Sequence, residues 1–124
     1  MEGNAYQILS MRTNDRKATG RLTNKISNTS KYDVGGILNA ALGLSGEVGE
    51  LNDILKKWIF HEKNLDVEHT KKEIGDIIWY VAMMCESFGW KLDDILRMNI
   101  DKLKQRYPDG FDVELAKYPP QAQR

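Results

Sequence analysis

The sequence predicts an all-α domain, because helical spacing dominates it and signs of strands are missing. Three long stretches repeat apolar residues at the interval of a single helix face. Only three prolines occur, and no stretch of alternating β-branched residues stands out. With 124 residues, of which 41% are hydrophobic, the chain is long enough to form one domain with its own core.

The amino-acid composition bears on which classes of binding partner the protein has and in which cellular compartment it is found. Lys and Arg number 18, as do Asp and Glu, so the net charge gives no indication of nucleic acid or of an anionic membrane. The single cysteine, Cys85, has no internal disulfide partner, which fits a reducing cytoplasm. No apolar run is long enough for a membrane span, and the N-terminus lacks the features of a signal peptide. We therefore expect a cytoplasmic protein.

Residues 1–35 are expected to form a short helix followed by a polar loop. Ala5–Met11 has an amphipathic pattern, whereas Thr13–Asp33 is rich in Asn, Thr, Ser, Lys and Arg. Such a composition is typical of a loop or of a segment that a ligand or partner orders. Gly35 and Gly36 end the segment, and a helical core over residues 36–110 follows, then a tail over 111–124, all in a single domain.

The first core helix is predicted over residues 36–61. Placed at about 100° intervals, its apolar residues form one broad arc, and Glu47 falls inside that arc with Glu50 at its edge. An acidic side chain on a core-facing stripe is costly unless it is paired or binds a metal.

The second core helix is predicted over residues 67–88, with Asp66 as its N-cap and Gly89 just past its end. Glu73 and Asp76 lie at the edge of its apolar arc. Its second half is apolar over most of the circumference, which indicates burial on more than one side and hence a subunit interface.

The third core helix is predicted over residues 92–107. Asn99, Lys102 and Arg106 fall on or beside its core-facing side, where an amide and two cations need an anionic partner. Pro108–Gly110 has the composition of a turn that ends the helix.

Two acidic pairs carry the functional prediction. Glu47 with Glu50, and Glu73 with Asp76, are each spaced i, i+3, so each pair shares a helix face. On neighbouring helices the four carboxylates would surround one point, where a hard divalent cation such as Mg²⁺ or Mn²⁺ would neutralise them. A single such pair is usually solvated surface, but two pairs with basic residues downstream indicate a site that hydrolyses a nucleoside polyphosphate.

These residues also carry a family resemblance. Gly43–Leu51 followed by Glu73–Tyr80 resembles the MazG-like nucleotide pyrophosphohydrolases of the all-α NTP pyrophosphatase superfamily, whose signature is E-x-x-E, a gap, then E-x-x-D. Here 22 residues separate Glu50 from Glu73, and Asn99–Pro108 is similar to the family's third block. The resemblance covers about residues 36–110.

The resemblance implies a helical bundle, a homodimer or dimer of dimers, that uses Mg²⁺ to cleave nucleoside triphosphates between the α and β phosphates, in nucleotide-pool sanitation. The products would be a monophosphate and pyrophosphate. The resemblance also implies roles for single residues. Four acidic residues would bind the metal, and Glu47 or Glu50 would also deprotonate the attacking water. Four other residues would contact the substrate. The metal ligands would be Glu47, Glu50, Glu73 and Asp76, and the substrate contacts Asn99, Lys102, Arg106 and Tyr80.

Several alternatives stay open at the level of sequence. A relative with a narrower substrate, such as a dUTP or dCTP pyrophosphatase, would show the same motif. A non-catalytic module that senses nucleotide or metal is a different class, and a purely structural homodimeric bundle is a third. Nothing in the sequence indicates a base or a sugar.

Overall fold

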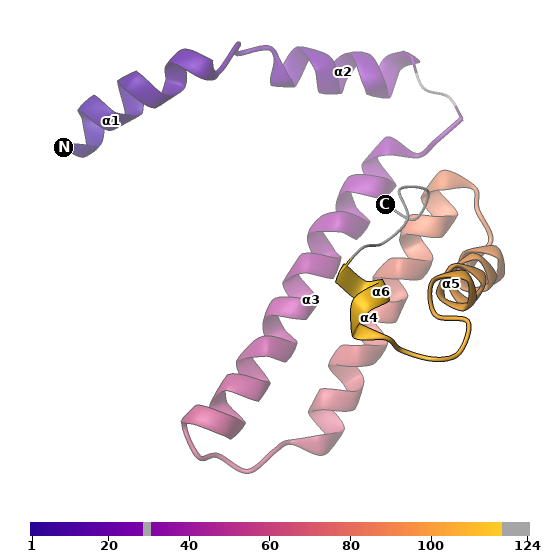
Figure 1. Cartoon of the computed structure of the whole chain (residues 1–124). Coiled ribbons are helices and arrows are strands. Elements are labelled where there is room, and N and C mark those ends of the chain that lie inside the picture. The colour runs from indigo at the N-terminus through magenta and orange to yellow at the C-terminus, as the bar shows by residue number, and fades with distance from the viewer. Residues whose placement is uncertain (29–30, 118–124) are drawn as a thin grey trace.

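The computed structural model describes residues 1–28 and 31–117, and all regular structure in these residues is helical. The elements shown in Figure 1 are α1 (Gly3–Ser10), a 3-10 turn η1 (Met11–Thr13), α2 (Ala18–Asn28), α3 (Val34–Phe60), α4 (Val67–Phe88), α5 (Leu92–Arg106) and α6 (Val113–Lys117). The predicted all-α class is confirmed, and the three long helices lie within two residues of their predicted bounds.

An antiparallel hairpin of α3 and α4 is the packed part of the chain (Figure 1). Ala40 and Cys85 are its buried apolar residues, and their small side chains let the two helices approach closely. Gly43 allows the same approach one turn further on, because a Cβ at this position would overlap the ring of Tyr80. Small residues on α3 thus set the distance at which acidic side chains of the two helices meet.

Local interactions fix both ends of the hairpin. At the start of α3, the Asp33 side chain accepts a hydrogen bond from the Gly36 N–H at 3.0 Å, and the Asp33 N–H donates to the Ser87 carbonyl at 2.9 Å. At the start of α4, Asp66 accepts from the His69 N–H at 3.0 Å, which confirms the predicted N-cap. Gly89 ends α4 with φ of 75°, as predicted for a left-handed C-terminal glycine.

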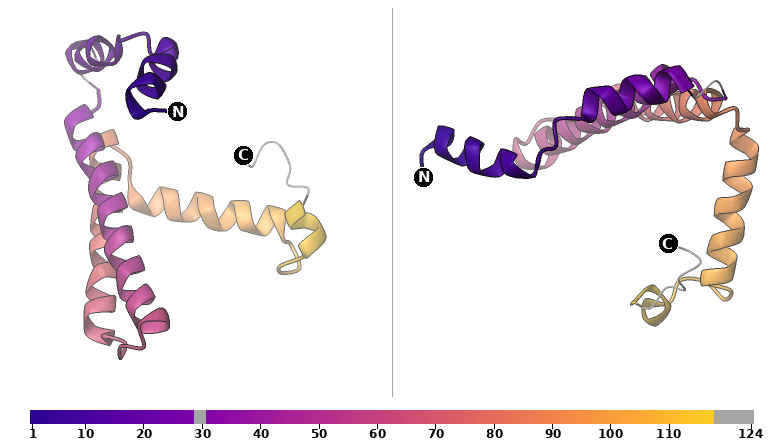
Figure 2. Two further views of the ribbon diagram at one scale, coloured as in Figure 1. Left: turned by 90° about the vertical axis from the view of Figure 1, so that its left-hand side faces the viewer. Right: turned by 90° about the horizontal axis from the view of Figure 1, so that it is seen from above.

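The remaining helices leave the hairpin. Figure 2 shows α5 running away from the end of α4 and off the hairpin, while α1 and α2 form an arm that extends from the start of α3. No residue of α1, α2 or α5 is buried. At the junction, Tyr32 meets Phe88 edge-to-face at 5.2 Å and Phe88 stacks on Trp90 at 4.2 Å. This aromatic contact anchors the point from which the arm and α5 diverge.

The polar segment 13–33, predicted as a loop, contains a helix. Ala18–Asn28 forms α2, and its residues Leu22 and Ile26 are spaced i, i+4 on one face. The polar composition was misleading because α2 packs little against the rest of the chain, so few apolar residues are needed to form it. Of this segment, residues 29–30 lie outside the described part of the chain. In the predicted tail, Val113–Lys117 forms α6, and residues 118–124 also lie outside the described part.

The expected core-facing placement of Asn99, Lys102 and Arg106 is not found within one chain. Asn99 and Lys102 are exposed, and Arg106 is half-buried with its guanidinium donating to the Ala116 carbonyl at 3.1 Å. The reason is the course of α5, which turns away from α3 and α4 after Gly89 and buries none of its residues against these two helices.

The chain exposes far more surface than a compact monomer. Its accessible surface is 10428 Å², whereas a folded monomer of 14.2 kDa exposes about 6,800 Å². Large apolar side chains are exposed on every long helix, among them Leu9, Ile26, Ile78, Leu96 and Met98. No helix in the described residues has the length and apolarity that crossing a bilayer requires.

Candidate metal centre

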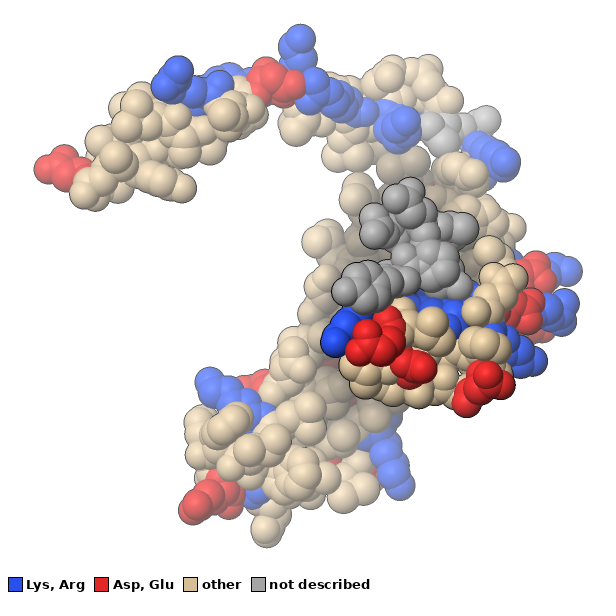
Figure 3. Space-filling model, in the orientation of Figure 1, with Lys and Arg blue, Asp and Glu red and all other residues tan. Residues whose placement is uncertain are grey.

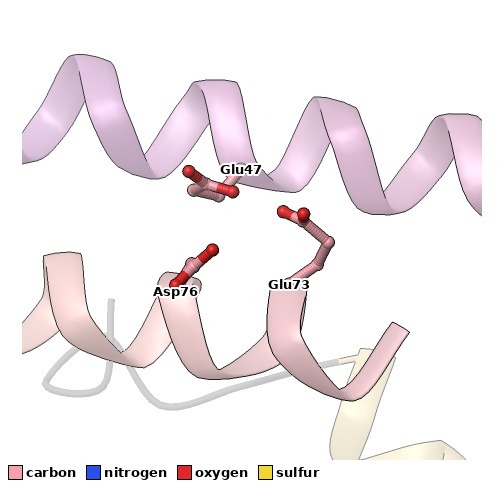
Figure 4. Close-up of side chains that lie close together, drawn as sticks. All are labelled: Glu47, Glu73 and Asp76. Carbon is pink, nitrogen blue, oxygen red and sulfur yellow. The ribbon is translucent and has the colours of Figure 1, made fainter. Parts of the chain in front are cut away.

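Three carboxylates meet in the middle of the hairpin. Glu47 projects from α3 toward Glu73 and Asp76 of α4, as Figure 4 shows, and one oxygen from each lies within 4.8 Å of the others. Glu73 and Asp76 face the same neighbour because they are one helical turn apart. Glu73 is buried, Glu47 is half-buried and Asp76 is exposed. The cluster therefore reaches from the helix interface to solvent.

Two oxygens of this cluster are buried without a donor. No hydrogen-bond donor among the described residues reaches Oε2 of Glu47 or Oε2 of Glu73. A buried acceptor without a partner costs roughly 1–3 kcal/mol, and more when it is charged. Something positive is required between the two carboxylates, either a proton or a cation.

The pKa values of Glu47 and Glu73 are shifted in opposite directions by the contact between their carboxyl groups. A hydrogen bond to Glu73, helped by burial and by the charges of Glu50, Glu73 and Asp76, raises the pKa of Glu47 to about 7. The hydrogen bond from Glu47 lowers the pKa of Glu73, and hydrogen bonds from Glu50 and His69 add to that effect. These opposite shifts make Glu47 the carboxyl group of the pair that takes up a proton more readily.

A divalent cation fits the same place. The ligand atoms are carboxylate oxygens, which Mg²⁺ and Mn²⁺ prefer, and no thiolate belongs to the cluster that would favour a softer metal. The two oxygens that lack donors would gain a positive partner, and the proton on Glu47 would be released. The donor set thus satisfies the chemical requirement for a hard divalent ion.

Glu50, the fourth acidic residue predicted from the sequence, lies beside this cluster. It is exposed and lines a cavity of about 480 Å³ that His69 and Lys63 also line. Gly46 and Gly49 form part of the wall, and no atom lies within 4 Å of where a Cβ would be at either position. The absence of side chains on this face of α3 leaves room next to the carboxylates for a ligand the size of a nucleotide.

Tyr80 and the polar residues of α5 are placed differently. Tyr80 lies one turn after Asp76, against Gly43, with its ring 5.0 Å from that of Trp79 in an edge-to-face contact. Asn99, Lys102 and Arg106 belong to α5, which runs away from the hairpin that carries the carboxylates (Figure 2). A single chain therefore brings together the acidic residues but not the predicted phosphate contacts.

His69 is a residue of the site whose contact with Glu73 was not predicted from the sequence. Its Nε2 lies 3.0 Å from Oε1 of Glu73. The spacing of four residues between His69 and Glu73 on a predicted helix was the available signal, because such residues are neighbours on the helix surface.

The sequence comparisons agree with this geometry. Residues 37–111 match the MazG nucleotide pyrophosphohydrolase domain, a match that spans more than half of the chain. The chain belongs to the MazG family. The matched MazG region contains α4 and α5 in full, nearly all of α3, and every carboxylate of the cluster.

A curated relative is the Gene 37 protein of Mycobacterium phage L5, which is 28% identical over 79 residues, covering 60% of this chain and 69% of the phage protein. No solved structure matches significantly. Membership of the MazG family indicates nucleotide pyrophosphohydrolase chemistry, and the carboxylate cluster agrees with the divalent-metal dependence typical of that family.

Proposed function

We propose that this MazG-family protein is a Mg²⁺-dependent nucleoside triphosphate pyrophosphohydrolase that acts on the cytoplasmic nucleotide pool. It would cleave between the α and β phosphates and release a monophosphate and pyrophosphate. The observation that carries the proposal is the meeting of Glu47, Glu73 and Asp76 from two helices, with two buried oxygens that lack donors, inside a MazG domain.

Glu47, Glu50, Glu73 and Asp76 are the proposed metal ligands. A bound Mg²⁺ supplies positive charge that binds phosphate oxygens and lowers the pKa of a nearby water. Glu73 and Asp76 present their carboxylates from α4, and Glu47 presents its own from the facing turn of α3. Glu50 links this cluster to the adjacent cavity, where the nucleotide has room to bind.

Glu47 and Glu50 are the candidates for the general base. A carboxylate that binds a metal ion is deprotonated, so either residue could take a proton from a water that lies beside the ion. In the proposed reaction, a water oxygen bonds to phosphorus, the bridging P–O bond breaks, and the water proton passes to the carboxylate. Pyrophosphate leaves with the electron pair of the broken bond.

The phosphate contacts are proposed to come from a second copy of the chain. Asn99, Lys102 and Arg106 lie on α5, and no residue of this helix is buried by the described part of the chain. The chain exposes roughly 3,600 Å² more than the roughly 6,800 Å² expected for a compact monomer, and obligate dimer interfaces bury roughly 2,000–5,000 Å² in total. A homodimer, or a dimer of dimers, would cover this surface and bring α5 of one copy to the carboxylates of another. Tyr80 is proposed to flank the sugar or base.

The test is a Mg²⁺-dependent turnover assay over a panel of ribo- and deoxyribonucleoside triphosphates that resolves pyrophosphate from orthophosphate. We expect monophosphate and pyrophosphate in equal amounts, with turnover lost in Glu50→Gln and Asp76→Asn. Glu68→Gln is the matched control, because Glu68 is an exposed acid on α4 whose nearest charged partner is Lys72 at 3.5 Å. Orthophosphate as the product would contradict the assigned bond cleavage.

The same panel separates the alternative functions. Strong preference for one pyrimidine deoxynucleotide would indicate a narrower dUTP or dCTP pyrophosphatase. Tight nucleotide binding without turnover in the unmutated protein would indicate a non-catalytic sensing module. A purely structural bundle predicts that Glu47→Gln or Glu73→Gln stabilises the protein even when Mg²⁺ is present.

A further inference from the structure

His69 holds one of the two carboxylate oxygens of Glu73. Its Nε2 lies 3.0 Å from Oε1, four residues along the same helix, and the His69 side chain is 53% exposed while that of Glu73 is 7% exposed. Oε2 of the same carboxylate is buried with no donor in reach among the described residues. The two oxygens of Glu73 therefore have different surroundings, one bonded to His69 and one without a donor.

The start of α4 fixes the position of His69. The His69 N–H donates to Oδ1 of Asp66 at 3.0 Å, and the next residue, Thr70, bonds the Asp66 carbonyl through both its N–H, at 2.9 Å, and its hydroxyl, at 2.7 Å. His69 thus lies in a first helical turn whose backbone is held by a capping residue. The imidazole therefore projects toward Glu73 from an anchored backbone, and its contact with Oε1 restricts the side chain of Glu73.

This contact defines the chemical role of the ring. A glutamate that binds a metal ion is ionised, and an ionised carboxylate only accepts hydrogen bonds. Nε2 of His69 must then carry the proton, which both the Nε2–H tautomer and the imidazolium provide. A nitrogen that carries a proton cannot bind a metal ion. The contact is therefore that of a donor that orients the carboxylate.

We propose that His69 is a positioning residue, which holds Oε1 of Glu73 so that Oε2 faces the Glu47–Asp76 side of the cluster and is preorganised for a divalent cation. This inference rests on the proposed metal site and adds a residue outside the E-x-x-E and E-x-x-D motif. Without the donor, the glutamate side chain regains torsional freedom that ion binding must then remove. Loss of such an orienting partner typically weakens metal affinity by roughly 10- to 100-fold.

The experiment measures Mn²⁺ affinity by calorimetric titration of the full chain, without nucleotide, at one fixed pH. We expect His69→Leu to weaken Mn²⁺ binding about tenfold or more. His69→Gln keeps a side-chain N–H donor and is expected to recover most of the affinity. The control is His61→Leu, which removes the other histidine of the chain, at the C-cap of α3 and outside the cluster; its affinity should equal that of the unmutated protein.

The outcomes separate this inference from the proposed function. Equal affinity in His69→Leu and the unmutated protein would overturn the role of His69 while leaving the metal site intact, as would an equal loss in His69→Gln and His69→Leu. Absence of Mn²⁺ binding in the unmutated protein would overturn both.

A second measurement needs no variant and so does not depend on the folding of His69→Leu. Long-range ¹⁵N–¹H correlation of the histidine rings should show His69 protonated at Nε2 in the metal-free protein. A neutral ring protonated only at Nδ1 would overturn the proposal.

Discussion

The α3–α4 hairpin and the helices that leave it differ in how far their residues are buried within one chain. The hairpin contains the buried apolar residues, Ala40 and Cys85, and the carboxylate cluster, whereas no residue of α1, α2 or α5 is buried. Figure 3 shows the resulting shape, in which the N-terminal arm curves away from the rest of the molecule, with Lys and Arg side chains along it. The hairpin assembles its carboxylate cluster within one chain, whereas the outer helices bury none of their residues. Both leave large apolar side chains exposed, among them Ile78 on α4 and Leu96 on α5.

This difference explains why the acidic residues meet within one chain and the predicted phosphate contacts do not. The carboxylates lie on the two helices that pack together, so their distances are set by the hairpin itself. Asn99, Lys102 and Arg106 lie on a helix whose position depends on what covers it. The predictions below test each side of the comparison, beginning with the largest effect.

The largest effect is expected at an apolar residue that the hairpin leaves exposed. Ile78 is 55% exposed on α4, and we expect Ile78→Asp to dissociate the oligomer completely at micromolar concentration, because a charge would be buried in the interface. Light scattering after size exclusion measures the mass. Lys71→Asp, at a polar position of the same helix, should leave the oligomer intact. A monomeric unmutated protein would contradict the proposal of a second copy.

A smaller effect is expected from overpacking inside the hairpin. Ala40 is 0% exposed, so Ala40→Leu should lower the free energy of unfolding by about 1–3 kcal/mol. The same replacement on the arm, Ala5→Leu, should change it by less than about 0.5 kcal/mol. Urea unfolding followed by helical circular dichroism measures both. Equal effects at the two positions would mean that the arm is packed as tightly as the hairpin.

The pH dependence of stability tests the charge of the cluster. Folding raises the pKa of Glu47 from about 4.5 to about 7, so the folded chain binds this proton more tightly than the unfolded chain does. The resulting stabilisation is complete below about pH 4.5 and is lost as the pH rises through 7. We expect the Tm of the metal-free protein to fall over this range more than the Tm of Glu47→Gln. Saturating Mg²⁺ should abolish the difference, and identical pH profiles without metal would contradict the shared proton.

The smallest effect concerns the cap of α4. Asp66→Ala removes the acceptor for the His69 N–H and should cost about 1 kcal/mol of stability. Asp66→Asn keeps a capping oxygen and should restore most of the loss. The free energy of unfolding from urea titrations measures both variants, and an equal loss in Asp66→Ala and Asp66→Asn would assign the effect to charge rather than to capping.

The sequence predicted those parts of the fold that depend on local signals. Asp66 and Gly89 were identified as helix ends because capping requires particular residue types at particular positions. Helix α2 was missed because a helix that packs little against its own chain needs no continuous apolar stripe. The course of α5 was missed because helical periodicity gives the orientation of a residue around its own axis, not the identity of the neighbouring helix.

The candidate site was predictable to a similar extent. The spacing of Glu47, Glu73 and Asp76 on two helices was enough to predict that they would meet once those helices packed. The spacing did not predict that Glu73 would be buried and Asp76 exposed, because the depth of each side chain depends on the facing helix. The contact of His69 with Glu73 was not predicted, because a histidine near a helix end does not by its type alone indicate a function. The metal and substrate roles of these residues stay predictions.

The most direct test of the central claim is anomalous diffraction from crystals of the protein grown with Mn²⁺. The claim is that acidic residues from α3 and α4 hold one divalent ion between them. We expect an anomalous peak bounded by the carboxylates of Glu47, Glu73 and Asp76, with Glu50 at its edge. Well-diffracting crystals with no peak at this position, or with manganese bound only elsewhere, would contradict the claim.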